Sequence, residues 1–151
     1  MKRFKPLVTV LFIVYCLCML WLLFGQRLDS TRDGTYFEEL RSMLFPFQTI
    51  VQFVRIIVTG KPADVVPHAW QNLIGNVVMF MPVGMCLPFF FSRCRFAKST
   101  FLIGLLIVTC IELTQFFTLL GSLDFDDFLL NMIGIMLGFA VFKLFWAKMR
   151  D

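Results

Sequence analysis

The sequence predicts an all-α polytopic membrane protein with four transmembrane helices and one shorter amphipathic helix. Hydrophobic residues make up 59% of the 151-residue chain, and the mean hydropathy is +0.82. Four apolar runs are long enough to cross a bilayer, and basic residues cluster beside them. A soluble fold of this size could not bury 20 phenylalanines together with those runs. We therefore expect residues 1–151 to form a single membrane domain whose main partner is the lipid bilayer.

The predicted spans follow from the length of the apolar runs. A helix rises 1.5 Å per residue, so it needs about 20 mostly apolar residues to cross the hydrocarbon core. Four stretches meet this requirement: 7–24, 73–91, 101–120 and 128–146. The first follows a short basic segment and resembles a signal peptide, but no small-residue cleavage pattern follows its long apolar run. We expect it to be a retained signal anchor.

The distribution of charge predicts the orientation of these spans. Lysines and arginines cluster in three places: 2–5, 93–98 and 143–150. With four spans, all three clusters fall on one side, which the positive-inside rule makes the cytoplasm. The sequence therefore predicts a multi-pass protein of the cell membrane with its N-terminus and C-terminus in the cytoplasm. Nearly all the acidic residues fall on the outer side.

A shorter amphipathic helix is predicted between the first two spans, over residues 47–58. Its apolar residues recur at helical spacing: Phe47, Ile50, Val51, Val54, Ile57 and Val58. Polar residues line the opposite face: Gln48, Gln52 and Arg55. Pro46 suits the first turn of such a helix and Gly60 its end. Because about 12 residues cannot cross a bilayer, we expect an interfacial or re-entrant helix on the outer side.

Polar residues within or at the entrances of the spans are the candidate binding residues. They are Asn72, Asn76, Glu112, Gln115, Asp124, Asp127 and Asn131. In the predicted topology the intramembrane members lie within roughly 12 Å of the outer boundary, and spacings of three or four place those of one helix on one face. A carboxylate at that depth is costly in lipid, so we expect these faces to turn toward one another or toward a wet cavity. Glu112 is the strongest candidate.

A purely structural interpretation of these residues remains open. Asparagine and glutamine side chains can link helices by hydrogen bonds, Asp124 or Asp126 can cap a helix, and Asp127 suits a first turn. Gly134 and Gly138 are spaced as close-packing positions between helices.

We expect no cofactor and no bound metal. The five cysteines are an odd number without metal-ligand spacing, which argues against a disulfide framework or a zinc site. Glu112, Asp124 and Asp127 could offer oxygen ligands to magnesium or calcium, but acids in a turn are as easily solvated. The basic residues lie beside apolar spans, which is typical of topology signals and not of nucleic-acid binding. The oligomeric state is left open.

Three ordered blocks resemble the VanZ-like family, which is named for an accessory teicoplanin-resistance membrane protein. The blocks are Asn72-x3-Asn76-x3-Phe80-x-Pro82-x-Gly84, Glu112-x2-Gln115-Phe116, and Gly121-x2-Asp124-x2-Asp127-x3-Asn131-x2-Gly134-x3-Gly138. The resemblance is strongest over residues 44–142, where a Leu-x-Pro-Phe segment also matches. Many members carry an arginine where this chain has Ser122. The resemblance implies a cell-envelope membrane protein associated with glycopeptide tolerance.

Three functions are compatible with these residues. The first is an envelope protein that binds a lipid-linked or amphiphilic molecule in an outward-facing polar cavity. The second is a membrane-embedded enzyme that acts on an amphiphile at the outer leaflet, with Glu112 or Asp127 as general base. The third is a proton-linked or cation-linked carrier in which Glu112 titrates. Whether the protein is an enzyme stays open at this point.

Overall fold

The computed structural model describes residues 5–25, 46–118, 120 and 124–148. In chain order its elements are α1 (Lys5–Phe24), α3 (Gln48–Thr59), α4 (Val66–Phe90), the short 3-10 helix η3 (Ser92–Arg95), α5 (Ala97–Thr118) and α6 (Phe125–Lys148). Four of these helices are long and apolar enough to cross a membrane, and α3 is a shorter apolar helix. The predicted fold class is confirmed. Ser122 and most of the predicted loop before α3 lie outside the described residues.

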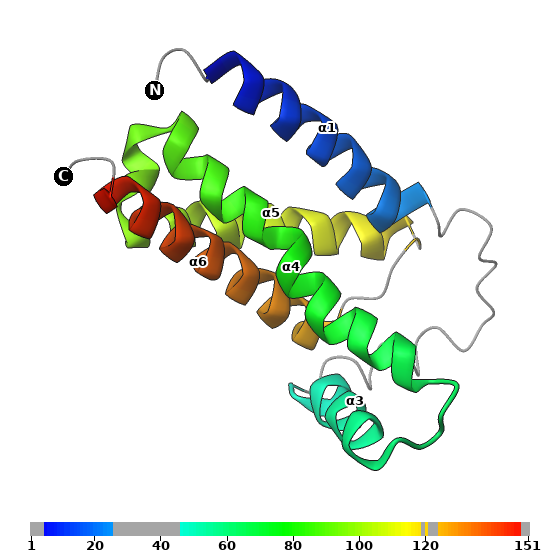
Figure 1. The fold of residues 1–151 in the computed structure, drawn as a ribbon. Coiled ribbons are helices and arrows are strands. Elements are labelled where there is room, and N and C mark those ends of the chain that lie inside the picture. Colours follow the sequence, from blue (N-terminus) through cyan, green and yellow to red (C-terminus); the bar gives the residue numbers. More distant parts are fainter. Residues whose placement is uncertain (1–4, 26–45, 119, 121–123, 149–151) are drawn as a thin grey trace.

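The four long helices alternate in direction (Figure 1). The beginning of α1, η3 and the end of α6 lie at one end of the molecule, which we call the η3 end. α3 lies at the opposite end, beside the beginning of α4, and we call this the α3 end. α4, α5 and α6 pack together, and α1 lies on the outside of this group.

Several helix boundaries differ from the sequence prediction. α4 begins before residue 73, because Pro67 lies in its first turn, where a missing backbone N–H costs nothing. α6 begins before residue 128, because Asp124 Oδ1 accepts the backbone N–H of Asp126 at 2.8 Å and caps the helix. α5 begins at Ala97 and ends at Thr118. The earlier starts lengthen these helices beyond the apolar runs that identified them, although α4 and α5 end at Phe90 and Thr118, before the predicted ends at residues 91 and 120.

Glycines allow α4 and α6 to approach until their backbones touch. At three glycines an added Cβ would lie 2.3 Å or less from a carbonyl oxygen of the facing helix: Gly84 (oxygen of Ile135), Gly134 (oxygen of Val77) and Gly138 (oxygen of Met81). No side chain fits at such distances. The predicted close-packing role of Gly134 and Gly138 is confirmed, and Phe80 and Ile135 fill the fully buried core around this contact.

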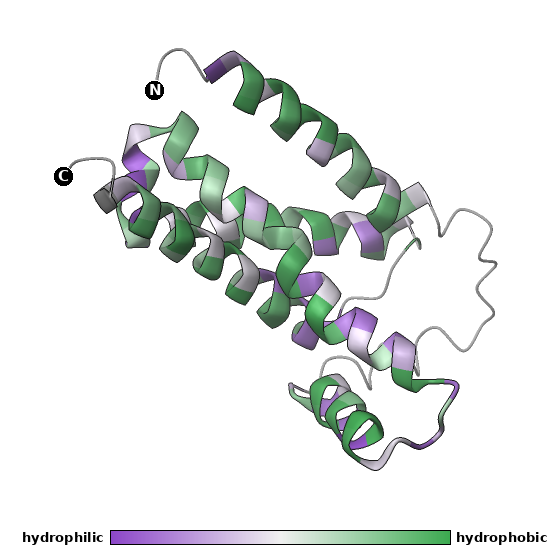
Figure 2. Cartoon of the chain, viewed as in Figure 1, coloured by the Kyte–Doolittle hydropathy of each residue, from purple (hydrophilic) through white to green (hydrophobic). Residues whose placement is uncertain are grey.

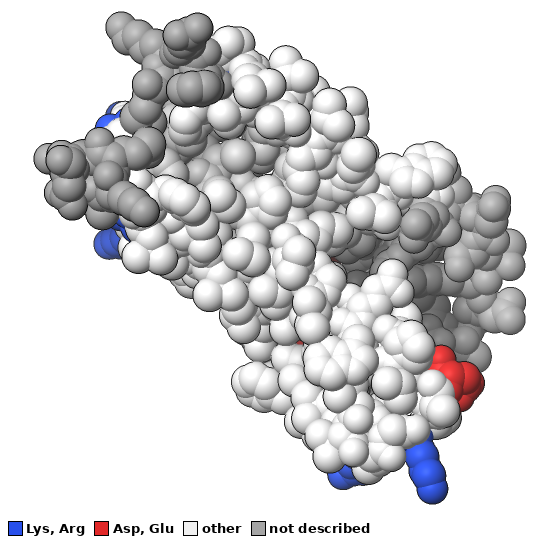
Figure 3. All heavy atoms as spheres, viewed as in Figure 1, with Lys and Arg blue, Asp and Glu red and all other residues white. Residues whose placement is uncertain are grey.

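Most of the lateral surface is apolar. α1 exposes Leu11, Leu17 and Trp21 by 60–64% of their surface, and Figure 2 shows hydrophobic residues along the length of all four long helices. Basic side chains gather at the two ends of the molecule with an uncharged region between them (Figure 3). An apolar surface of this extent needs lipid around it.

The ends of α3 are set by two residues with positive φ. Phe47 precedes the helix with a φ of 68°, and Gly60 follows it with a φ of 65°. The backbone N–H of Gly60 donates to the carbonyl oxygen of Ile56 at 2.8 Å, which ends the helix as expected. The expectation for Pro46 was wrong, because Pro46 lies in the turn before the helix and not in its first turn.

Candidate functional site

Hydrogen bonds between side chains join α4, α5 and α6 near the α3 end. Asn76 Nδ2 of α4 donates to Asp127 Oδ1 of α6 at 2.7 Å. One turn further along α6, Asn131 Nδ2 donates to Glu112 Oε1 of α5 at 3.4 Å. Glu112 and Asn131 are only 4% and 3% exposed. The sequence predicted that Glu112 would face the bundle interior within reach of such a partner, and the structure places it there.

Gln115 extends the same set of contacts to α1. It lies one turn beyond Glu112, is 5% exposed, and donates from Nε2 to the carbonyl oxygen of Leu23 at 3.3 Å. Leu23 belongs to the last turn of α1, where carbonyl oxygens have no partner within the helix. Gln115 therefore supplies a donor that the end of α1 requires. We call Asn76, Glu112, Gln115, Asp127 and Asn131 the polar layer.

Asp124 has the structural role that the sequence left open for it, because it caps α6. Besides capping α6, its Oδ2 accepts the hydroxyl of Thr49 on α3 at 2.9 Å. It is thus engaged in attaching α3 to the beginning of α6.

Asp126 is a residue that sequence reasoning did not include in the candidate site. Its side chain is fully buried, and it accepts the backbone N–H of Phe47 at 2.5 Å and that of Ile50 at 2.9 Å. These are free donors at the beginning of α3, where a negative charge is also favourable to the helix dipole. Asp126 therefore caps a helix that lies far away in the sequence. The available signal was a second acid in the first turn of α6.

Two buried amide oxygens keep unused hydrogen-bonding capacity. Asn131 Oδ1 and Asn72 Oδ1 accept no hydrogen bond from any residue in the described ranges. Asn72 is half-buried one turn before Asn76 on α4. It lies next to the polar layer but makes no hydrogen bond to it within the described ranges. Asn131 is inside the layer. A buried acceptor without a donor is costly, and it marks the place where a donor from outside the chain would be most favourable.

The polar layer can bind and orient a polar group. It offers the carboxylates of Glu112 and Asp127 and three amides, and these groups accept and donate hydrogen bonds. Within the described ranges no three His, Cys, Asp or Glu side chains are grouped as metal ligands. The layer itself contains no serine, cysteine or histidine nucleophile.

The helices and the polar layer together define a polytopic helical membrane protein with an internal polar site at one end of its bundle. The family model VanZ/LLP1 matches residues 12–146. The chain belongs to this family, as its motifs predicted, and the match extends beyond residues 44–142 to include much of α1. Comparison with curated proteins gave no match, and comparison with solved structures gave none either.

Proposed function

We propose that this protein binds the polar group of a lipid-linked or amphiphilic molecule at the polar layer, from the outer side of the cell membrane. The observation that carries the proposal is the buried Asn131 Oδ1, which has no donor among the described residues. Its own amide nitrogen is held by Glu112, which fixes the direction in which the oxygen points. A hydroxyl, amine or amide of a ligand would satisfy this oxygen and recover about 1–3 kcal/mol.

The surroundings suit an amphiphile better than a small polar solute. Ile74 and Val78 on α4 are 49% and 54% exposed, and each lies two positions from Asn76. Ile133 on α6 is 49% exposed and lies two positions after Asn131. Two positions correspond to about 200° around a helix, so each of these residues marks the lipid-facing side of its helix at the depth of the layer. A hydrocarbon chain could lie in the bilayer at this depth while its polar group enters the layer between the helices. The resemblance to the VanZ-like family suggests that such binding affects tolerance to teicoplanin.

Neutral isosteres of the two carboxylates test the proposal. Glu112→Gln and Asp127→Asn nearly preserve shape but remove charge, so each should reduce any teicoplanin tolerance at least tenfold per inserted molecule. The measurement is the inhibitory concentration in cells, divided by the amount of protein recovered in the membrane. Asp64→Asn is the control, because Asp64 is an exposed acid in the loop between α3 and α4. Tolerance that falls only in step with protein abundance would contradict the proposal.

The orientation of the protein belongs to the same proposal. Arg93, Arg95 and Lys98 lie in or beside η3, and Lys143 lies in the last turns of α6 at the same end. The Arg95 guanidinium lies 4.4 Å from the ring centre of Trp146, a pairing that suits a membrane interface. The positive-inside rule assigns the η3 end to the cytoplasm, and the α3 end with the polar layer then faces outward.

Cysteine labelling tests this orientation. Asp64→Cys should react with an impermeant maleimide in intact cells, whereas Arg93→Cys should react only after permeabilisation. Both native side chains are exposed. Cys94 adds little background, because it is fully buried and burial raises the pKa of its thiol. Labelling of Arg93→Cys in intact cells, with Asp64→Cys protected, would reverse the proposed topology.

A further inference from the structure

α3 has three faces, where a helix on the surface of a soluble protein has two. One face packs on the protein and comprises Thr49, Ile50, Phe53, Ile56 and Ile57. A second, the apolar stripe, is 46–78% exposed and comprises Phe47, Val51, Val54 and Val58. The third, the polar stripe, comprises Gln48, Gln52, Arg55 and Thr59. An exposed apolar stripe on a helix at the end of a membrane bundle is the face that enters the lipid.

The two exposed stripes are neighbours on the helix. Each polar residue follows an apolar one by a single position, as Gln48 follows Phe47 and Gln52 follows Val51. Consecutive residues are about 100° apart around an α-helix. When the apolar stripe lies in the hydrocarbon, the polar stripe therefore lies at the level of the lipid headgroups.

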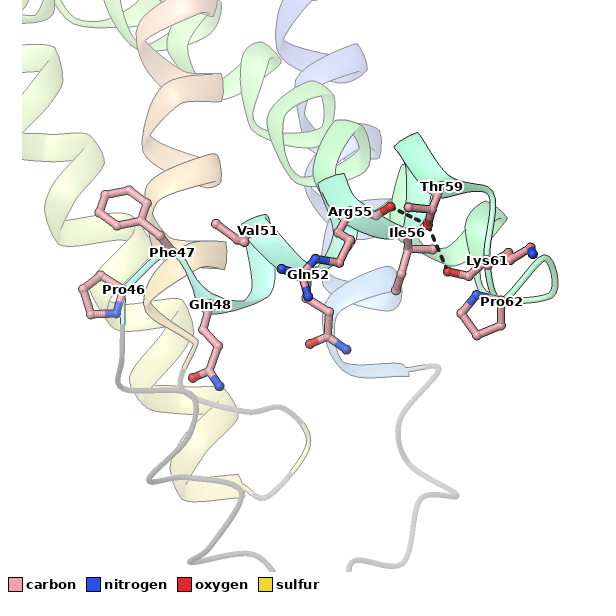
Figure 4. Close-up of a pocket in the computed structure, with 10 residues that line it drawn as sticks. All are labelled: Pro46, Phe47, Gln48, Val51, Gln52, Arg55, Ile56, Thr59, Lys61 and Pro62. Carbon is pink, nitrogen blue, oxygen red and sulfur yellow. Dashed lines mark hydrogen bonds between the residues drawn. The ribbon is translucent and has the colours of Figure 1, made fainter.

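A groove with a volume of about 670 Å³ runs along this polar stripe (Figure 4). The amides of Gln48 and Gln52 and the cations of Arg55 and Lys61 are among its lining residues. Gln48 and Gln52 project to the same side of the helix in Figure 4. Thr59 fixes the far end, because its hydroxyl donates to the carbonyl oxygens of Arg55 at 2.7 Å and of Lys61 at 3.4 Å.

The charge of the groove selects an anion. Neither Arg55 nor Lys61 forms an ion pair with a residue in the described part of the chain, and no carboxylate occurs among its described lining residues. A guanidinium and an ammonium beside amide donors match the oxygens of a phosphate group.

We propose that the groove on α3 binds the phosphate of an anionic membrane lipid, whose acyl chains lie against the apolar stripe. The position of the groove beside a lipid-facing stripe and the positive charge of its described lining residues together select this occupant. The site is separate from the polar layer, since no residue is shared between them, and it does not depend on the function proposed for that layer.

Native mass spectrometry of the purified full chain in detergent tests this site. The protein is titrated with phosphatidylglycerol and, separately, with phosphatidylcholine of the same acyl chains. We expect phosphatidylglycerol to bind at least fivefold more tightly, and Arg55→Gln with Lys61→Gln to bring the two affinities within twofold. Both side chains are exposed, so the double variant should fold. The matched control is Arg93→Gln with Lys98→Gln, which removes the same charge at the η3 end and should retain the preference.

Two results would overturn the proposal. One is a preference that survives in the α3 variant or is lost equally in the η3 control, because the cations of the groove would then contribute nothing specific. The other is abolition of the preference by millimolar inorganic phosphate, which would make the groove a site for a soluble anion and not for a lipid. Retention of the preference in phosphate, with its loss in the α3 variant alone, supports the lipid site.

Discussion

Gly84→Ala is expected to destabilise the protein severely. The added Cβ would lie 1.8 Å from the carbonyl oxygen of Ile135, and that oxygen belongs to the backbone of α6 and cannot rotate away. Overpacking of a core usually costs about 1–3 kcal/mol, and a clash between two backbones should reach or exceed the upper value. Gly138→Ala should behave in the same way, because its Cβ would lie 1.9 Å from the oxygen of Met81.

Gly75→Ala is the matched control for this prediction. Gly75 lies on the same helix as Gly84, and a Cβ added there would meet nothing within 4 Å. Alanine favours a helix over glycine by about 1 kcal/mol, so this variant should be as stable as the native protein or slightly more stable. The measurement is the midpoint of thermal unfolding in detergent. Equal midpoints for Gly84→Ala and Gly75→Ala would show that α4 and α6 do not touch as described.

Asp126→Ala is expected to detach α3 from the bundle. The change removes the acceptor of two backbone N–H groups at the beginning of α3, and each buried donor left unsatisfied costs about 1–3 kcal/mol. Amide hydrogen exchange over Gln48–Thr59 should accelerate about tenfold or more, because 1.4 kcal/mol corresponds to a factor of ten in an opening equilibrium. Exchange in α5 should stay unchanged, since both hydrogen bonds removed by the change lie at the beginning of α3.

Asp64→Ala controls for the loss of one negative charge near α3. Asp64 is exposed and takes part in no hydrogen bond with a described residue, so exchange in α3 should be unaffected. Acceleration of similar size in both variants would mean that overall charge, and not the cap, holds α3 in place.

The sequence was sufficient to predict the four spans, the approximate extent of α3 and the interior position of Glu112 within reach of Asn76, Gln115, Asn131 or Asp127. The structure shows which of these partners is used, since Asn131 donates to Glu112. These features depend on the length of apolar runs, on helical periodicity and on the cost of burying a carboxylate in a membrane. Each is a local property of the chain or involves very few possible partners. Gly134 and Gly138 were recognisable for the same reason, because their spacing alone places both on one face of a helix.

Contacts with backbone atoms could not be predicted in this way. Gln115 donates to the carbonyl oxygen of Leu23, and Asp126 accepts the N–H groups of Phe47 and Ile50. Every residue has a backbone carbonyl and every residue except proline has a backbone N–H, so the sequence carries no mark of which one is used. The third face of α3 was hidden for a related reason. Ile50 and Ile57 turn toward the protein while Val54 does not, and a division into apolar and polar residues cannot separate two apolar faces.

A structure determined in a lipid nanodisc containing membrane lipids would test the central claim most directly. We predict density for the polar group of a bound amphiphile within hydrogen-bonding distance of Asn131 Oδ1, with Glu112 still accepting the Asn131 amide. Its chain should leave the layer between the helices and continue into the surrounding lipid. The claim would be contradicted if the polar layer were closed and empty in lipid, with Asn131 Oδ1 satisfied by a donor from the protein itself.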